Sequence, residues 1–322
     1  MTMLTLLRRG LIVAAAALIL PPLVPGTGLS AQKPDTLAPG GLIPATTAME
    51  TAWDIPRNPR TDPTLAPSAL TDQIKRGFEI FNDTPAKARR FTGNGLTCGN
   101  CHLNAGQRDK ALPLVGAASA YPEYNKRQGR MITLEDRIVG CFLRSLNATG
   151  VRQEAGGKGR ALLPDSSCGE VAALSAYIGW LSSDHRAGIK VPWRGRNTIP
   201  LGNLLPIASL DARKGKKLFL ERCANCHGRE GEGVAIGDKK AGPLWGPRSW
   251  NDGAGAARVY TLAGMIRHDM PYLDPGSLTD EESQQIAFFI NSKPRPSFPF
   301  KEQDYLTEPV PPDALYYLRA RK

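Results

Sequence analysis

The chain has 322 residues, of which 41% are hydrophobic and 22% are charged, and these ordinary globular values exclude a largely disordered or multi-span membrane chain. At roughly 150 residues per domain, this length predicts two domains. The formal charge of +11 favours an anionic substrate or partner. Nucleic acid is not favoured as that partner, since the sequence carries no helix-turn-helix, zinc-finger or RNA-binding signature.

The first 31 residues have the pattern of a secretory signal peptide. Arg8 and Arg9 precede an unbroken apolar run over residues 11–20, which two prolines end and small residues follow. This run is about half the ~20 residues that a transmembrane helix requires, so we expect residues 1–31 to be cleaved rather than to anchor the chain. The mature protein should lie in the periplasm, if the source is bacterial, without a membrane span.

Four of the six cysteines belong to two copies of the motif Cys-x-x-Cys-His. At this spacing two thiols can add across the vinyl groups of one haem, while the adjacent histidine binds the iron on its proximal side. A zinc half-site or a redox dithiol fits poorly with two copies that both end in histidine in an exported chain. The sequence therefore predicts two covalently bound haems c, attached through Cys98, Cys101 and His102 in the first half and through Cys223, Cys226 and His227 in the second.

The segments before the two motifs repeat each other. Gly77 and Phe81 precede the first motif, and Gly215 and Phe219 precede the second, with the same mutual spacing. At that spacing both residues share one helix face, so the glycine can admit a crossing helix while the phenylalanine packs towards the haem. The first copy is longer, which indicates an insertion around residues 82–95.

The segments after the motifs repeat as well. Residues 113–116 and 243–246 both read Pro-Leu-x-Gly, and we expect each to form a loop that shields the proximal histidine. Each half then closes with an apolar-periodic helix, near residues 171–181 and 286–290.

Together these patterns predict a mainly α fold with two cytochrome c-like haem domains in tandem. The first domain should span residues 69–189 and the second residues 209–293. A linker rich in proline and glycine, residues 190–208, separates them. Pro-rich residues 32–68 and 294–322 should form extended N- and C-terminal arms.

The distal ligand of the second haem is predicted to be Met270. This residue is followed by proline in a loop after the second motif, which is typical of a thioether ligand. His268 is the alternative ligand, although a surface histidine beside Asp269 explains it more simply.

The first half offers no such residue. Between His102 and the end of the domain, Met131 is the only methionine, and no histidine precedes His185. Another kind of distal ligand is therefore needed.

A predicted helix over residues 134–146, with Thr133 and Asp136 as its capping box, carries a candidate. On it, Arg137, Cys141 and Ser145 are four residues apart and share a face, joined by Arg144. A thiol flanked by guanidinium groups favours its thiolate form. The alternative is that Cys141 forms a structural disulfide with Cys168, the other cysteine outside the motifs.

At this point the residues resemble the dihaem thiosulfate dehydrogenase family, periplasmic cytochromes c that oxidise two thiosulfates to tetrathionate. The likeness covers nearly all of the mature chain, and its markers are residues 94–103, residues 135–145 with their Glu-Asp-Arg, cysteine and Arg-Ser, and residues 243–255. The resemblance implies that the first haem is the active site, with His102 and Cys141 as its iron ligands. It implies His227 and Met270 for the second haem, which transfers electrons.

The resemblance also implies that Arg127, Arg137 and Ser145 hold the substrate around the catalytic Cys141, and Arg144 is a further candidate for sulfonate binding. It implies that a soluble or membrane-attached cytochrome c-type acceptor collects the electrons singly, and that the same site can reduce tetrathionate. Some members carry a redox-switching lysine before the distal methionine. Here that position is Asp269, so such switching is not expected.

Three other functions fit parts of the pattern. A non-catalytic dihaem electron carrier would use the arginine-rich helix as a solvated face. A dihaem peroxidase would need one five-coordinate iron. Another sulfur-oxidation cytochrome with a His/Cys haem would act on protein-bound sulfur.

Overall fold

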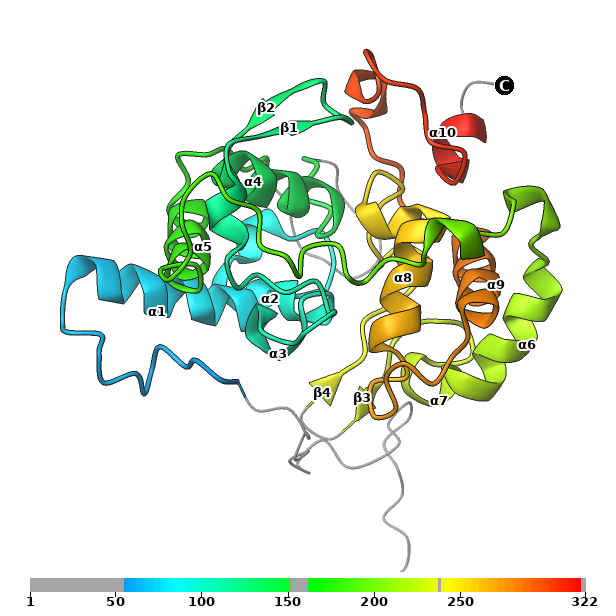
Figure 1. Cartoon of the computed structure of the whole chain (residues 1–322), viewed down its shortest axis with the longest axis horizontal. Helices are drawn as coiled ribbons and strands as arrows, with labels where there is room; N and C mark the ends of the chain where they lie inside the picture. Colours follow the sequence, from blue (N-terminus) through cyan, green and yellow to red (C-terminus); the bar gives the residue numbers. More distant parts are fainter. Residues whose placement is uncertain (1–54, 151–161, 237–238, 320–322) are drawn as a thin grey trace, which may run out of the picture. The chain divides into compact units, whose positions relative to one another are not determined.

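The computed structural model describes residues 55–150, 162–236 and 239–319. The predicted signal peptide and most of the predicted N-terminal arm lie outside these ranges. The described chain is mainly helical, and its strands form two short antiparallel hairpins (Figure 1). None of the described helices is long and apolar enough to cross a membrane.

Both halves follow a helix, motif, loop, helix order. The elements of the first half are α1 (Ala69–Asn82), α2 (Thr84–Lys87), α3 (Leu103–Gly106), β1 (Glu123–Asn125), β2 (Arg130–Ile132), α4 (Leu134–Arg144) and α5 (Gly169–Trp180). Those of the second half are α6 (Ala212–Arg222), α7 (Ala224–His227), β3 (Ala235–Ile236), β4 (Lys239–Lys240), α8 (Val259–Asp269), α9 (Asp280–Asn291) and α10 (Leu315–Arg319). The insertion expected around residues 82–95 forms α2 and a following turn of 3-10 helix.

Local sequence signals set the starts of two helices that matter for function. At α4 the Thr133 hydroxyl accepts the Asp136 N–H at 3.2 Å, and the Asp136 carboxylate accepts the Thr133 N–H at 3.1 Å. The predicted capping box is therefore confirmed. Thr279 and Glu282 make the same reciprocal pair at α9.

The repeated glycines are the points where helices cross. A Cβ atom on Gly77 would overlap the carbonyl oxygen of Ala173 in α5, and one on Gly215 would overlap that of Gln285 in α9. Only glycine lets the backbones of α1 and α5, and of α6 and α9, approach so closely. The prediction that these glycines admit a crossing helix is confirmed in both halves.

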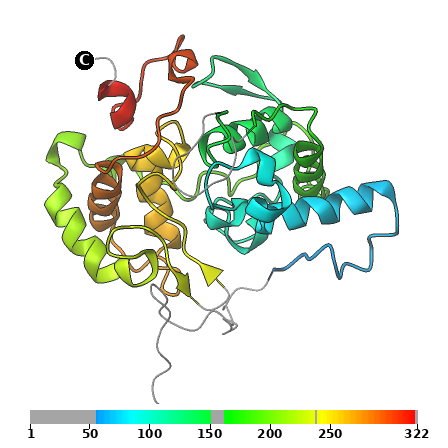
Figure 2. The same cartoon turned by 180° about the vertical axis from the view of Figure 1, so that it is seen from behind.

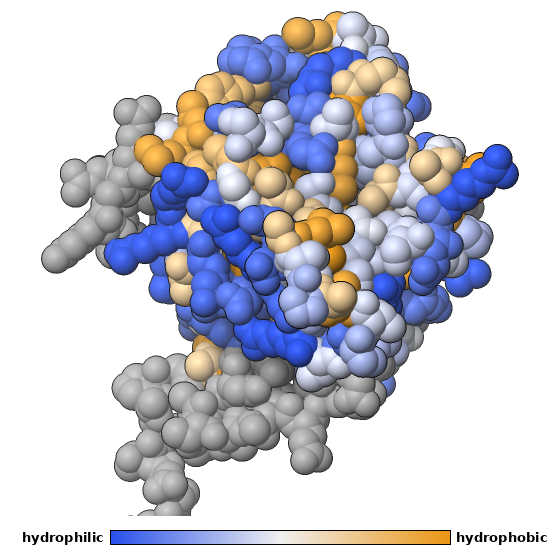
Figure 3. All heavy atoms as spheres, turned by 90° about the vertical axis from the view of Figure 1, so that its left-hand side faces the viewer, coloured by the Kyte–Doolittle hydropathy of each residue, from blue (hydrophilic) through white to orange (hydrophobic). Residues whose placement is uncertain are grey.

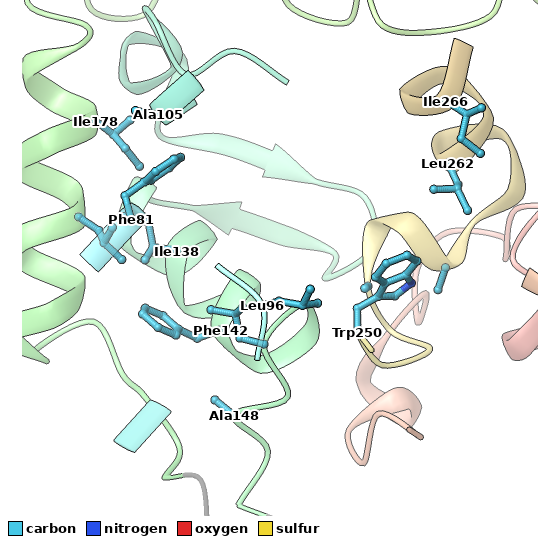
Figure 4. Close-up of a cluster of buried hydrophobic side chains, with 14 of the residues drawn as sticks. Phe81, Leu96, Ala105, Ile138, Phe142, Ala148, Ile178, Trp250, Leu262 and Ile266 are labelled. Atoms are coloured by element: carbon cyan, nitrogen blue, oxygen red, sulfur yellow. The ribbon is translucent and has the colours of Figure 1, made fainter. Parts of the chain in front are cut away.

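Buried apolar side chains of both halves belong to one cluster (Figure 4). Phe81, Ile138 and Phe142 contribute from the first half, and Trp250 and Ile266 from the second. Phe81 is 1% exposed and its counterpart Phe219 is fully buried. The helices that carry the motifs and the candidate ligands are therefore held by a shared core.

The C-terminal segment lies beside the first half. In two opposite views, the stretch that ends in α10 runs next to the β1–β2 hairpin (Figures 1 and 2). Tyr305, Ala314 and Tyr317 of this segment are at most 7% exposed. The predicted C-terminal arm thus contributes buried side chains as well as surface.

The face where α1 begins has a mixed surface. Hydrophilic and hydrophobic residues are interspersed on it (Figure 3). Leu70, in the first turn of α1, is 63% exposed. Isolated apolar residues of this kind are normal on protein surfaces. This face therefore does not by itself indicate a binding partner.

The glycine crossings lead to a stability prediction. Gly77→Ala should lower the free energy of unfolding by about 1–3 kcal/mol, because the new methyl group meets a backbone carbonyl that cannot move aside alone. Gly179→Ala in α5 is the matched control, since the space around its Cβ position is open and alanine favours a helix by up to about 1 kcal/mol. Thermal unfolding of the holoprotein measures both. Equal melting temperatures for the two variants would contradict this account of the crossing.

Candidate active site

The first motif presents a histidine suited to bind haem iron. His102 Nδ1 lies 2.6 Å from the carbonyl oxygen of Leu112, and since a carbonyl only accepts, Nδ1 carries the proton. Burial lowers the pKa of His102 to about 4, so the ring is neutral. A neutral imidazole with Nδ1–H fixed by a carbonyl has its Nε2 lone pair available for a metal, as proximal ligands require.

The second motif repeats this arrangement. His227 Nδ1 lies 3.1 Å from the carbonyl oxygen of Gly242, and burial again lowers the pKa of the histidine. Leu112 and Gly242 directly precede the prolines of the two Pro-Leu-x-Gly segments. The carbonyl that orients each histidine therefore comes from the residue just before each segment, and shielding of the histidines by these segments stays a prediction. The residues of both motifs fit a haem.

Cys141 lies close to the first motif. Burial raises the pKa values of Cys98 and Cys101 to about 12, and a further contribution in the same direction comes from the Cys141 sulfur. Arg137 likewise contributes to the lowered pKa of His102. The fold thus places the thiol and guanidinium of α4 within electrostatic range of the haem-attachment segment.

Within α4, Arg137 donates a hydrogen bond from Nη1 to Cys141 Sγ at 3.3 Å. The four-residue spacing brings the two side chains onto one face, as predicted. The negative charge of the Cys141 sulfur raises the pKa of Arg137. The contact places a cation directly against the Cys141 sulfur.

The alternative role for Cys141 was a disulfide with Cys168. Both cysteines are free thiols. Cys168 is instead the N-cap residue of α5, and its sulfur lies 3.5 Å from the Asp165 N–H. The structure therefore gives the two thiols separate environments.

A cavity of about 660 Å³ opens beside α4. Arg127, Arg137 and Ser145, which the sequence placed at the substrate, all line it. The cavity is strongly basic, because Lys126, Arg144, Arg194 and Arg258 also line it, against the acidic Glu123, Asp136 and Glu308. Such an excess of positive charge suits an anionic ligand.

The arginines of this cavity differ in whether a carboxylate pairs with them. Arg194 pairs with Glu123 at 2.5 Å and Arg258 with Asp313 at 2.7 Å. Within the described ranges, neither Arg127 nor Arg137 forms an ion pair with a carboxylate, since Arg127 bonds to neutral oxygens and Arg137 to the Cys141 sulfur. Neither charge is therefore neutralised by a paired carboxylate, and that of Arg127, which bonds only to neutral oxygens, is the more available to a ligand.

Arg144 has a structural role that the sequence did not indicate. Its side chain is 10% exposed and forms a two-pronged ion pair with Asp304, at 2.6 and 2.7 Å. It also donates to the carbonyl oxygen of Gly253 at 3.1 Å and stacks on the Phe298 ring at 4.1 Å. Although Arg144 lines the cavity, Asp304 balances its charge, and sulfonate binding by Arg144 stays a prediction.

The candidate distal ligand of the second half follows α8. Met270 is half-buried at the C-cap of that helix, and Asp269 before it is 3% exposed. Asp269 lies near Cys101 of the first motif, whose pKa it raises. The rival ligand His268 has its Nε2 3.3 Å from the Thr198 carbonyl oxygen in the linker. Ligation by Met270 stays a prediction.

The chain matches two domain models of haem proteins. Residues 87–186 match the cytochrome c domain of SoxA/TsdA, and residues 210–290 match cytochrome C oxidase, cbb3-type, subunit III. The thiosulfate dehydrogenase of Allochromatium vinosum is 40% identical over 240 residues, which cover 73% of this chain and 82% of that protein. The chain belongs to the thiosulfate dehydrogenase family.

Other members of the family agree with this assignment. The thiosulfate dehydrogenase of Stutzerimonas stutzeri is 35% identical over 242 residues, covering 75% of this chain and 73% of that protein. The solved structure of thiosulfate dehydrogenase (TsdBA) from Marichromatium purpuratum, in its as-isolated form, aligns with a TM-score of 0.65 and 35% identity over 74% of this chain. This chain spans about half of that solved chain, since the alignment covers 49% of it. Two tandem cytochrome c domains in a mainly helical fold are therefore established.

Several residues that line the cavity are distant in sequence from α4 and were not predicted. Gly255 and Arg258 come from the second half, and Tyr305 and residues 308–312 come from the C-terminal segment. The Asn-Asp-Gly-Ala-Gly stretch at 251–255 was recognised as a family marker, but nothing in its local pattern indicated what it contacts.

The structural role of Arg144 is testable through stability. Arg144→Gln should lower the free energy of unfolding by about 3–5 kcal/mol, because it leaves the buried Asp304 carboxylate without its cation. Arg130→Gln is the control. It breaks the exposed pair with Asp136, so the cost should be about 0–1 kcal/mol. Denaturant unfolding of the holoprotein gives both values. An Arg144 variant as stable as the control, but with weakened anion binding, would instead show that Arg144 serves the ligand.

Proposed function

We propose that this chain is a periplasmic dihaem cytochrome c, exported by a signal peptide at residues 1–31, that oxidises two thiosulfates to tetrathionate. The observation that carries the proposal is the Arg137–Cys141 pair, which lies near the first haem motif and adjoins a basic cavity that also contains Arg127 and Ser145. The relatives named above are thiosulfate dehydrogenases, and the same substrate accounts for this arrangement.

Haem c, covalently bound at each motif, supplies one-electron oxidation and reduction. Cys98 and Cys101 would hold the first group and Cys223 and Cys226 the second. His102 with Cys141, and His227 with Met270, are the proposed axial pairs. A thiolate lowers and a thioether raises the potential of an iron centre, so electrons should pass from the first site to the second.

The cationic side chains allow two negatively charged thiosulfates to approach each other. Two thiosulfate dianions at about 4 Å repel each other by roughly 4 kcal/mol even in water. Arg127 and Arg137 offset this repulsion, and each can present paired N–H donors to sulfonate oxygens. The Ser145 hydroxyl adds a neutral donor at the same cavity.

Cys141 is the proposed site of bond formation. Its thiolate joins the sulfane sulfur of one thiosulfate to give a cysteine S-thiosulfonate, and the two electrons released would be taken up by the two haems, one by each. The sulfane sulfur of a second thiosulfate then attacks the bound sulfane sulfur, which breaks its bond to Cys141. Tetrathionate leaves, and the Cys141 thiolate is restored with no net proton change.

The contacts between the two halves suit onward electron transfer. Asn100 in the first motif donates to the Lys240 carbonyl at 3.2 Å, and Gly242, whose carbonyl holds His227, lies beside Leu96 and Asn100. The segments that carry the two haem motifs thus lie close together in space, although they are far apart in the sequence.

A soluble or membrane-attached cytochrome c-type acceptor would collect the electrons one at a time. With a reducing partner the same site would run as a tetrathionate reductase.

The role of Cys141 is tested by a matched pair of variants. Cys141→Ser should abolish thiosulfate-dependent haem reduction, with a loss of at least about 10³-fold in kcat, because serine supplies no thiolate. Cys168→Ser makes the same change at the other cysteine outside the motifs and should retain wild-type turnover. Anaerobic stopped-flow spectroscopy follows haem reduction while tetrathionate is assayed.

The same experiment separates the competing functions. Stoichiometric tetrathionate from wild type and Cys168→Ser alone supports the enzyme. A wild-type protein that ignores thiosulfate, yet exchanges electrons with an added cytochrome, would establish the electron-carrier alternative. Equal loss of activity in both variants would indicate that the two cysteines act as a pair.

A further inference from the structure

Arg127 is held at the cavity by groups from two distant parts of the chain. Its Nε donates to the Tyr305 hydroxyl at 3.2 Å, and its Nη1 donates to the Gly253 carbonyl at 2.5 Å. The Tyr305 N–H returns a bond to the Arg127 carbonyl at 2.7 Å. Both the side chain and the backbone of Arg127 are therefore fixed by the C-terminal segment.

The partners of Arg127 are neutral, and this distinguishes it from its neighbour. Gly253 accepts from Arg127 and Arg144 alike, but Arg144 also binds the Asp304 carboxylate, which neutralises its charge. A phenol and a carbonyl orient a guanidinium without cancelling its charge. Among the described residues, Arg127 Nη2 has no hydrogen-bond partner, so it can donate to a ligand oxygen.

Tyr305 itself is tightly held. It is 7% exposed, lines the cavity, and packs its ring on Tyr317 with the centroids 5.2 Å apart. Its backbone φ is 58°, in the left-handed region that is unfavourable for a bulky side chain. Such a conformation persists where surrounding contacts over-determine it, and it occurs often at ligand-binding sites.

We propose that Tyr305 is a positioning residue for substrate binding, whose hydroxyl holds the Arg127 guanidinium so that it binds a sulfonate oxygen in the cavity. The C-terminal segment is then part of the substrate site. The inference rests on the proposed function, since it takes a sulfonate-bearing sulfur anion as the ligand.

The chain provides a matched control for this role. Tyr305→Phe removes only the hydroxyl that accepts from Arg127. It leaves in place the ring contact with Tyr317, the bond from the Tyr305 N–H to the Arg127 carbonyl, and the bond from Arg127 Nη1 to the Gly253 carbonyl. Tyr317→Phe makes the same change on the same segment, at a residue that is 6% exposed and does not line the cavity. The Tyr317 hydroxyl instead donates to the Asp304 carboxylate and accepts a long bond of 3.4 Å from Arg144, and the two-pronged Arg144–Asp304 ion pair remains without it.

The experiment uses oxidised holoprotein and two readouts. Titration calorimetry measures the Kd for tetrathionate, a stable sulfonate dianion, and steady-state assays separate KM from kcat for thiosulfate. Tyr305→Phe should raise both the Kd and the KM about tenfold, the value of one charge-assisted hydrogen bond, with kcat within about twofold of wild type. Tyr317→Phe should leave all three within about twofold.

The outcomes are distinct. Wild-type protein that binds tetrathionate but does not oxidise thiosulfate would overturn the proposed function, while a selective rise in the Kd for Tyr305→Phe would still support the positioning role. Equal effects of the two substitutions would show that Tyr305 is only structural and would overturn the inference. Wild-type protein that does not bind tetrathionate would overturn it as well.

Discussion

The buried ion pair between Arg144 and Asp304 is the contact on which the candidate active site depends. Both side chains are withdrawn from water, so each is costly to bury without the other. The pair joins the last residue of α4 to the C-terminal segment, and the Asn251 N–H donates to the Arg144 carbonyl from the second half. Since Cys141 lies one helical turn before Arg144, this junction fixes the end of the helix that carries the thiol. The position of the candidate nucleophile is therefore set by three parts of the chain at once.

Side-chain amides of asparagine link the two domains next to this junction. Asn94 and Asn147 of the first half both donate to the Ser249 carbonyl, at 3.1 and 2.6 Å, and Asn251 donates back to the Leu143 carbonyl at 2.8 Å. Asn147 and Asn251 are fully buried, so these bonds satisfy polar groups that would otherwise be unpaired in the interior between the halves. The shared apolar core acts in the same direction. The separation between the two Cys-x-x-Cys-His motifs is thus set by contacts between the halves.

Features encoded over a few residues could be predicted from the sequence. The capping box at Thr133, the crossing at Gly77 and the Arg137–Cys141 contact each follow from helical spacing. The Pro-Leu-x-Gly repeat predicted loops beside the histidines, but not that the carbonyl before each loop would orient the ring. Contacts made across long stretches of chain could not be predicted, because spacing carries no information about them. The sequence therefore did not indicate that Asp304 pairs with Arg144, since it shows only the neighbours of Arg144 on α4. The contribution of the C-terminal segment to the cavity was missed for the same reason.

Arg144 and Asp304 are far apart along the chain, and this distance affects the order in which parts of the protein fold. Arg144 and Asp304 are 160 residues apart, and Tyr317 closes on both of them from still further along. Contacts of such long range form late, because the chain between them must first be ordered. Both Cys-x-x-Cys-His motifs precede, along the chain, the C-terminal residues that complete the basic cavity. The segments around the two motifs can therefore fold before the cavity is complete, and the cavity is a late product of folding.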